Sequence, residues 1–301
     1  MTKRIVICLM AALYLLLPLS VQAAPLDTER ACALTLEYTM DDVVFPNVEV
    51  AIYQVAEAYP DGTFALIAPY DNYPVSIHGI TSQAEWRDVA TTLAAYIAAN
   101  DTEPTAIGHT DKAGQVRFEN LTVGLYLVKG GHGKNEKGIY TFYDFMIYVP
   151  SPTEQGDYNY DLLAKPKCEN YTPAEHYRVV KLWKDSGTAL RPDYVVVDIL
   201  KDGNPYATVT LNHQNGWTYE WSDTDAAQWQ VAERDVPEGY QVAVTDHETV
   251  FTITNTNPDA PPPPPDTGDS FPLTTWVMVC GLVGVVLVLF GVWGRKYEKD
   301  K

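Results

Sequence analysis

The sequence is poor in basic residues and in cysteine, and it lacks the motifs that mark common catalytic sites. Its 301 residues include 21 Lys and Arg against 39 Asp and Glu, which gives a formal net charge of −18. A charge of this sign argues against a protein that binds nucleic acid or docks on anionic lipid. No His-Glu-x-x-His, Cys-x-x-Cys, glycine-rich phosphate loop or Gly-x-Ser-x-Gly pattern occurs, and the aspartate pairs lack calcium-loop spacing. The sequence therefore gives no support for an enzyme, a bound metal or a cofactor.

Long, uncharged apolar runs occur only at the two ends of the chain. At the first end, Lys3 and Arg4 precede an apolar run over residues 5–19, and Val21 and Ala23 then place small residues at the two positions that a signal peptidase reads. This order predicts a secretory signal peptide over residues 1–23, cut after Ala23. The alternative, a membrane-spanning helix, fits less well because the run is short.

The other end predicts a membrane anchor behind a stiff spacer. Residues 271–294 are uncharged and rich in Val, Leu and Gly, and their length suits one membrane crossing. The basic tail over residues 295–301 is expected to stay in the cytoplasm. Residues 258–270 form a Pro-rich linker, whose five consecutive prolines favour an extended polyproline II conformation. We therefore expect an exported protein that is held at the cell surface by its C-terminus.

The pattern between the two ends is that of a mainly β protein with two domains. Residues 174–257 contain short alternating runs separated by turn residues, which predicts an antiparallel β-sandwich of about seven strands. Residues 24–170 are also mostly strand-like, so we expect two β-sandwich domains in tandem. One helix is inserted in the first domain, because Ser82 to Glu85 form a capping box and apolar residues follow at helical spacing up to Ile97.

Only two of the four cysteines fall in the part that we expect to be exported. These are Cys32 and Cys168, because Cys8 belongs to the signal peptide and Cys280 to the anchor. Strand alternation points both side chains inward, and an oxidising environment permits a bond. The sequence therefore predicts a Cys32–Cys168 disulfide between the two ends of the first domain. The alternative is a pair of free thiols.

Three polar side chains of the second domain fall on strand faces that their apolar neighbours mark as buried. Lys181 shares a face with Val179 and Trp183, and an apolar residue stands two positions before both Glu233 and Asn255. Burial favours a neutral amine and a protonated carboxyl, which are a nucleophile and a proton carrier. If the three groups meet, the Lys181 amine can attack the Asn255 carboxamide, release ammonia and leave an isopeptide cross-link. The alternative is a buried, hydrogen-bonded triad that never reacts.

Six short motifs of the second domain point to a known family. They are Val180-Lys181-Leu182-Trp183, Arg191-Pro192, Gly216-Trp217-Thr218-Tyr219, Val231-Ala232-Glu233, Pro237-Glu238-Gly239-Tyr240 and Ile253-Thr254-Asn255-Thr256. Through these motifs residues 177–256 resemble the Cna-B domain, a repeat of Gram-positive surface adhesins and pilins. The resemblance implies that Lys181 and Asn255 form the bond and that Glu233 is the catalytic acid.

Two further resemblances concern attachment to the cell surface. The order Pro264-Pro265-Asp266-Thr267-Gly268, apolar run, basic tail resembles the cell-wall sorting signal of Gram-positive bacteria, in which a sortase cuts between Thr267 and Gly268 and joins the threonine to an amine. Residues 31–168, which end in Ala164-Lys165-Pro166-Lys167, are similar to the N-terminal domains of pilin subunits. That similarity implies that Lys167 accepts the threonine of the next subunit. The alternative is a solvated lysine at a strand end.

These features favour a structural role at the cell surface. The predicted function is that of a pilin-type subunit or wall-linked stalk protein, which a sortase attaches to peptidoglycan or to other pilin subunits. The alternative is a monomeric adhesin, anchored in the wall or membrane, that binds a host or bacterial surface ligand. An acceptor role for Lys167 distinguishes the two hypotheses.

Overall fold

The computed structural model describes residues 25–257, except residues 136–137, 155, 172–175, 186–190 and 226. The predicted signal peptide, the Pro-rich linker with Thr267 and Gly268, the membrane anchor and the basic tail lie outside these residues. Apart from Asp185, the described residues group into one compact unit by their contacts. In the part of the chain that the structure describes, no helix is long and apolar enough to cross a membrane.

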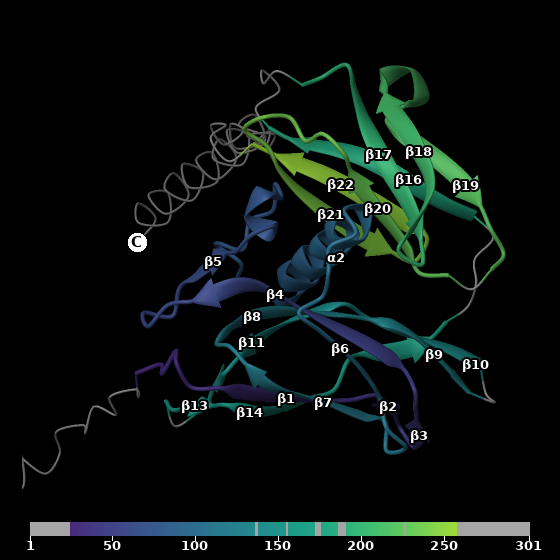
Figure 1. Cartoon of the computed structure of the whole chain (residues 1–301). Helices are drawn as coiled ribbons and strands as arrows, with labels where there is room; N and C mark the ends of the chain where they lie inside the picture. Colours follow the sequence, from purple (N-terminus) through teal and green to yellow (C-terminus); the bar gives the residue numbers. More distant parts are fainter. Residues whose placement is uncertain are drawn as a thin grey trace, which may run out of the picture. The chain divides into compact units, whose positions relative to one another are not determined.

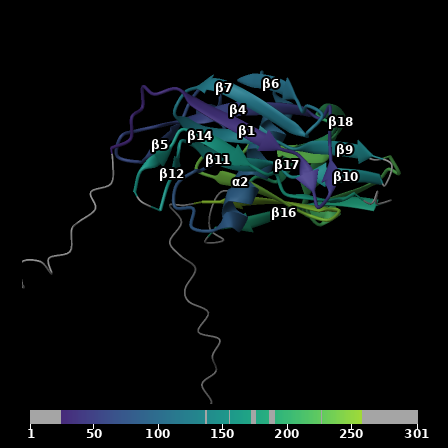
Figure 2. The ribbon, with the colours of Figure 1, turned by 90° about the horizontal axis from the view of Figure 1, so that it is seen from below.

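The first part of the compact unit, residues 25–171, is built from strands of two to ten residues. β1 (Cys32–Glu37) lies between β7 (Gln115–Leu121), which is antiparallel to it, and β14 (Asp161–Ala164), which is parallel, as Figure 2 shows from below. A second sheet has the order β11-β8-β4-β5, with β6 also paired to β4. Its strands are β4 (Glu49–Ala58), β5 (Phe64–Leu66), β6 (Ala106–His109), β8 (Gly124–Lys129) and β11 (Phe145–Val149).

Smaller sheets complete this first part. β9 (Gly131–Asn135), β10 (Gly138–Phe142) and β15 (Cys168–Asn170) form one sheet, in which β10 is the middle strand. Two short hairpins pair β2 (Thr39–Met40) with β3 (Val43–Val44), and β12 (Ser151–Pro152) with β13 (Tyr158–Asn159). Strands of two or three residues carry too little alternation to be predicted from sequence.

The predicted helix is confirmed. It is α2 (Gln83–Ala99), and Ser82 caps its N-terminus in a capping box with Glu85. The Ser82 hydroxyl accepts a hydrogen bond from the Glu85 N–H, and the Glu85 carboxylate accepts one from the Ser82 N–H. These bonds satisfy donors that a helix start otherwise leaves unpaired, and they fix where the helix begins.

The second part of the compact unit, residues 176–257, consists of two facing sheets. One has the order β19-β16-β22-β21 and the other β18-β17-β20. Their strands are β16 (His176–Lys184), β17 (Tyr194–Lys201), β18 (Asn204–Asn212), β19 (Thr218–Ser222), β20 (Trp229–Glu233), β21 (Gln241–His247) and β22 (Val250–Thr256), close to the predicted runs. The prediction of a purely antiparallel sandwich is wrong in one respect, because β16 and β22, the first and last strands, pair in parallel. The same holds for β1 and β14 in the first part.

One hydrophobic core runs through both parts. Helix α2 contributes Ala90, Leu93 and Ile97 to a buried cluster that also contains Val197 and Val231 of the second part. Figure 1 shows α2 between strands β8 and β11 on one side and β20 and β21 on the other, and the helix contacts all four. The helix therefore belongs to the packing of both parts. The division into domains at residues 24–170 and 174–257 stays a prediction.

Candidate functional site

Strand pairing brings Lys181, Glu233 and Asn255 together inside the second part. β16 and β22 are neighbours in one sheet, and their register places Lys181 opposite Ile253 and Asn255 opposite Trp183. Lys181 and Asn255 therefore lie on the same face of the sheet, on neighbouring strands and two residues apart in register. Glu233 is the last residue of β20 and approaches them from the facing sheet. Lys181 is 3% exposed, and Glu233 and Asn255 are fully buried.

The carboxyl of Glu233 lies between the two other groups. Its Oε1 accepts a hydrogen bond from Asn255 Nδ2 at 2.9 Å, and its Oε2 is 3.6 Å from Lys181 Nζ. Lys181 Nζ also donates to the carbonyl oxygen of Leu182 at 2.9 Å and lies 4.0 Å from the ring centroid of Trp183. Each oxygen of the acid thus faces one of the groups that a cross-link would join.

Burial sets the protonation of this acid. It raises the pKa of Glu233, while the Lys181 amine and the Asn255 hydrogen bond oppose the rise. Among the described residues, neither Glu233 Oε2 nor Asn255 Oδ1 accepts a hydrogen bond, although Lys181 Nζ lies 3.6 Å from Oε2. Because a buried carboxylate is costly to keep charged, burial favours a proton on this acid.

This arrangement can form an amide bond without any other group. The ammonium of Lys181 transfers a proton to the carboxylate of Glu233, and the neutral amine then attacks the Asn255 side-chain carbon. The C–Nδ2 bond breaks, and Glu233 relays protons so that the amide nitrogen leaves as ammonia. Nζ keeps one hydrogen in the new amide, and Glu233 ends protonated. That end state agrees with the direction in which burial moves its pKa.

Aromatic side chains close the site. The ring of Trp183 packs edge-on against Trp217 and Tyr240, with centroids 5.8 and 5.3 Å away. On the other side, the Tyr96 hydroxyl of helix α2 donates to the backbone carbonyl of Glu233 at 2.9 Å. Sequence reasoning missed Tyr96, which it treated only as part of a helix in another domain.

The predicted disulfide between Cys32 and Cys168 is wrong for this structure. Both cysteines are free, and they lie far apart along the strands. Cys32 begins β1, whereas Cys168 pairs with Phe142, whose ring packs on Tyr38 just past the end of β1. Extended chain from Cys32 to Tyr38 spans roughly 20 Å, and a disulfide needs Cα atoms within about 7 Å. Burial raises the pKa of each thiol to about 11.

The predicted acceptor, Lys167, is exposed in the segment between β14 and β15. Its Nζ lies 5.8 Å from the ring centroid of Tyr143. It borders a groove of about 730 Å³, which is also lined by Trp86, Tyr143 and Met146. The amine is thus open to solvent beside an apolar surface. The sorting residues Thr267 and Gly268 lie outside the described residues.

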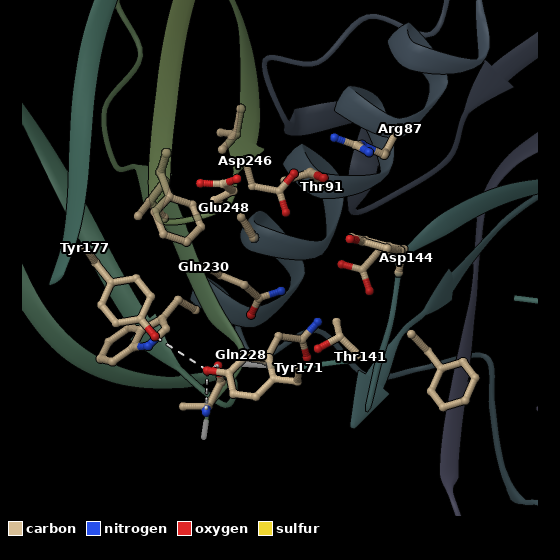
Figure 3. Close-up of a pocket in the computed structure, with 18 of the residues that line it drawn as sticks. Arg87, Thr91, Thr141, Asp144, Tyr171, Tyr177, Gln228, Gln230, Asp246 and Glu248 are labelled. Atoms are coloured by element: carbon tan, nitrogen blue, oxygen red, sulfur yellow. Dashed lines mark hydrogen bonds between the residues drawn. The ribbon is translucent and has the colours of Figure 1, made fainter. Parts of the chain in front are cut away.

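A separate small cavity of about 120 Å³ lies beside α2 (Figure 3). Figure 3 shows Asp144, Gln230 and Asp246 around it. Burial raises the pKa of Asp144 to about 6, and Gly130 N–H donates to its Oδ1 at 2.5 Å. Neither side-chain polar atom of Gln230 has a hydrogen bond to another described residue. Within the described ranges, no three His, Cys, Asp or Glu side chains are placed to hold a metal ion. The cavity therefore shows polar packing beside the helix and no metal centre.

Comparison with solved structures finds surface proteins and pilins of Gram-positive bacteria. One is a B repeat unit of the collagen-binding surface protein Cna of Staphylococcus aureus, at 16% identity over 77% of this chain and 99% of that chain, with a TM-score of 0.26. Another is a variant of the shaft pilin SpaA of Lactobacillus rhamnosus GG, at 17% identity over 76% and 98%, with a TM-score of 0.27. A third is the major pilin SpaD of Corynebacterium diphtheriae, at 16% identity over 78% and 68%, with a TM-score of 0.29. TM-scores of this size do not establish a shared arrangement of the whole chain.

The family comparison is specific to the second part. A search of curated proteins found no match. The family model of the Cna protein B-type domain matches residues 177–256. This range covers the seven strands β16 to β22, apart from the first residue of β16. It also contains the buried lysine, glutamate and asparagine. Residues 177–256 of this chain therefore match the Cna protein B-type domain over nearly the whole of the second part.

Proposed function

We propose that this chain is a structural protein of a Gram-positive cell surface, in which an isopeptide bond joins Lys181 to Asn255. The observation that carries the proposal is the buried contact of Glu233 with both groups inside a Cna protein B-type domain. A bond between β16 and β22 links the first and last strands of the domain. Pulling on the chain ends then cannot peel these strands apart without breaking a covalent bond.

The proposal extends to how the protein is attached. The chain is exported, cut by a sortase between Thr267 and Gly268, and joined through Thr267 to peptidoglycan or to Lys167 of another copy. This makes it a pilin-type subunit or a wall-linked stalk protein. The exposed amine of Lys167 supports an acceptor role, because a covalent acceptor must be reachable by a second enzyme and chain.

The isopeptide bond is tested by the intact mass of purified residues 25–257. We expect the wild-type mass to be one ammonia below the mass of the sequence, and the Lys181→Ala variant to show no loss. A wild-type mass equal to that of the sequence would contradict the proposed isopeptide bond.

Polymerisation is tested separately by an immunoblot of boiled, wall-released material from the native cells. We expect a ladder of bands in the wild type and its loss in Lys167→Ala. The matched control is Lys165→Ala, an exposed lysine two residues away that pairs with Glu37 and should leave the ladder intact. A single band in all three strains contradicts a shaft-subunit role and favours a monomeric adhesin that binds a surface ligand.

A further inference from the structure

The strand that carries the acid has one unpaired edge. β20 is an outer strand of its sheet and pairs only with β17 among the described strands. The next residue, Arg234, donates its N–H toward β17, to the carbonyl of Val196 at 2.9 Å. Backbone groups alternate in direction along an antiparallel strand, so the carbonyl of Glu233 points away from β17. A buried carbonyl at such an edge needs a partner from outside the sheet.

Helix α2 supplies that partner. The Tyr96 hydroxyl donates to the Glu233 carbonyl at 2.9 Å, and Tyr96 is 5% exposed. Its ring stacks on Tyr73 with centroids 5.2 Å apart, which holds the hydroxyl in place. All five residues of β20 are buried, including those on the face that strand alternation would leave in water. The helix thus takes the position at the strand edge that another strand would otherwise occupy.

We propose that Tyr96 is a positioning residue for the cross-linking reaction, because it holds the main chain of Glu233 so that the carboxyl stays between Lys181 and Asn255. This inference rests on the isopeptide bond proposed above. Glu233 ends its strand, and its backbone is held by the pairing with β17 on one side and by the Tyr96 bond on the other. The reaction needs one oxygen of the acid near the amine and the other near the amide at the same moment. Helix α2, which precedes the Cna protein B-type domain in the chain, therefore sets the rate at which that domain closes its bond.

The test measures the rate of bond formation in residues 25–257 carrying Tyr96→Phe. This change keeps the ring and removes only the hydroxyl. Cell-free synthesis is stopped at a fixed time, samples are quenched in denaturant at intervals, and the bonded fraction is taken from the intact mass. We expect bond formation to slow about tenfold, the size of effect that follows from losing one buried hydrogen bond. The pH at which the rate is half maximal should stay at the wild-type value, because Tyr96 touches the backbone of Glu233 and not its carboxyl.

The matched control is Thr92→Val, one turn earlier on the same helix. The Thr92 hydroxyl accepts a hydrogen bond from the Val244 N–H at 2.7 Å, so this variant also loses a bond between α2 and the second part. We expect both variants to lower Tm by a similar amount and only Tyr96→Phe to slow the reaction. A wild-type rate in Tyr96→Phe, or equal slowing in Thr92→Val, overturns the positioning role. A wild-type protein that never loses ammonia instead contradicts the proposed bond itself, so the two failures are distinguishable.

Discussion

The stability that the cross-link adds can be worked out from the structure and tested with Lys181→Met. Methionine has an unbranched side chain of similar length, so it can fill the space of a lysine side chain that is fully buried, but it has no amine to react. The variant should show no loss of ammonia. Its packing should change little, so the comparison isolates the covalent bond.

The expected magnitude follows from the length of chain that the bond closes. In the chain-entropy model for cross-links, a loop of roughly 75 residues, from Lys181 to Asn255, is worth about 4.5 kcal/mol. For a folded unit of this size, that free energy corresponds to a fall in Tm of about 10–20 °C. The measurement belongs at pH 4, because Glu233 is then protonated in the variant and adds no cost of a buried charge without its partner.

The assay is thermal unfolding at pH 4 together with intact mass on the same samples. The matched control is Lys184→Met, which changes an exposed lysine at the end of the same strand and should unfold with the wild type. Two results would refute the reasoning. One is a wild-type protein without the ammonia loss. The other is a bonded wild type that unfolds within about 2 °C of Lys181→Met, since the entropy of a loop this long cannot be so small.

Three further predictions concern protonation and thiols. Burial raises the pKa of Glu233, so the folded state binds its proton more tightly than the unfolded state does. Lys181→Met should therefore lose stability as pH rises above the ordinary glutamate range, relative to Lys181→Met combined with Glu233→Gln, in a series of Tm measurements. Burial raises the pKa of Asp144 from 3.8 to about 6, so Asp144→Asn should stabilise the protein increasingly as pH rises through that window, and not at pH 3. A thiol titration should find both Cys32 and Cys168 reduced and reactive in denaturant, but slow to react in the native protein at pH 7, because burial raises the pKa of each to about 11. Absence of free thiols in the unfolded, unreduced protein would contradict this structure.

The elements that sequence alone predicted well are those with one solvated face or an explicit cap. Strands of the second part such as β16 and β17 alternate between buried and more exposed side chains over eight or nine residues, whereas β20 is buried throughout. Helix α2 begins where Ser82 and Glu85 satisfy each other's backbone donors. In both cases the signal is local, so no knowledge of the rest of the fold is needed.

The contact of helix α2 with the second part could not be predicted in the same way. Alternation in β20 marks Gln230 and Ala232 as outward-facing, yet both are buried because the helix covers that face. The partner of a strand edge comes from about 140 residues earlier in the chain, and no local pattern records such a contact. Tyr96 was therefore missed, although a buried glutamine on an outward face is a sign that something covers it.

Strand alternation was used both to bring Lys181 and Asn255 together, which was correct, and to join Cys32 to Cys168, which was wrong. The two outcomes differ for a physical reason. Alternation along a strand predicts which face of the sheet a side chain occupies, but it does not predict how far along the sheet that side chain lies. β16 and β22 pair directly, so residues on one face and near in register must meet. β1 and β15 belong to different sheets, so both cysteines reach the same core at opposite ends of it. A prediction from facing side chains therefore needs a directly paired strand or an independent constraint on register. The motifs around Lys181 and Asn255 supplied that constraint, and the cysteines had none.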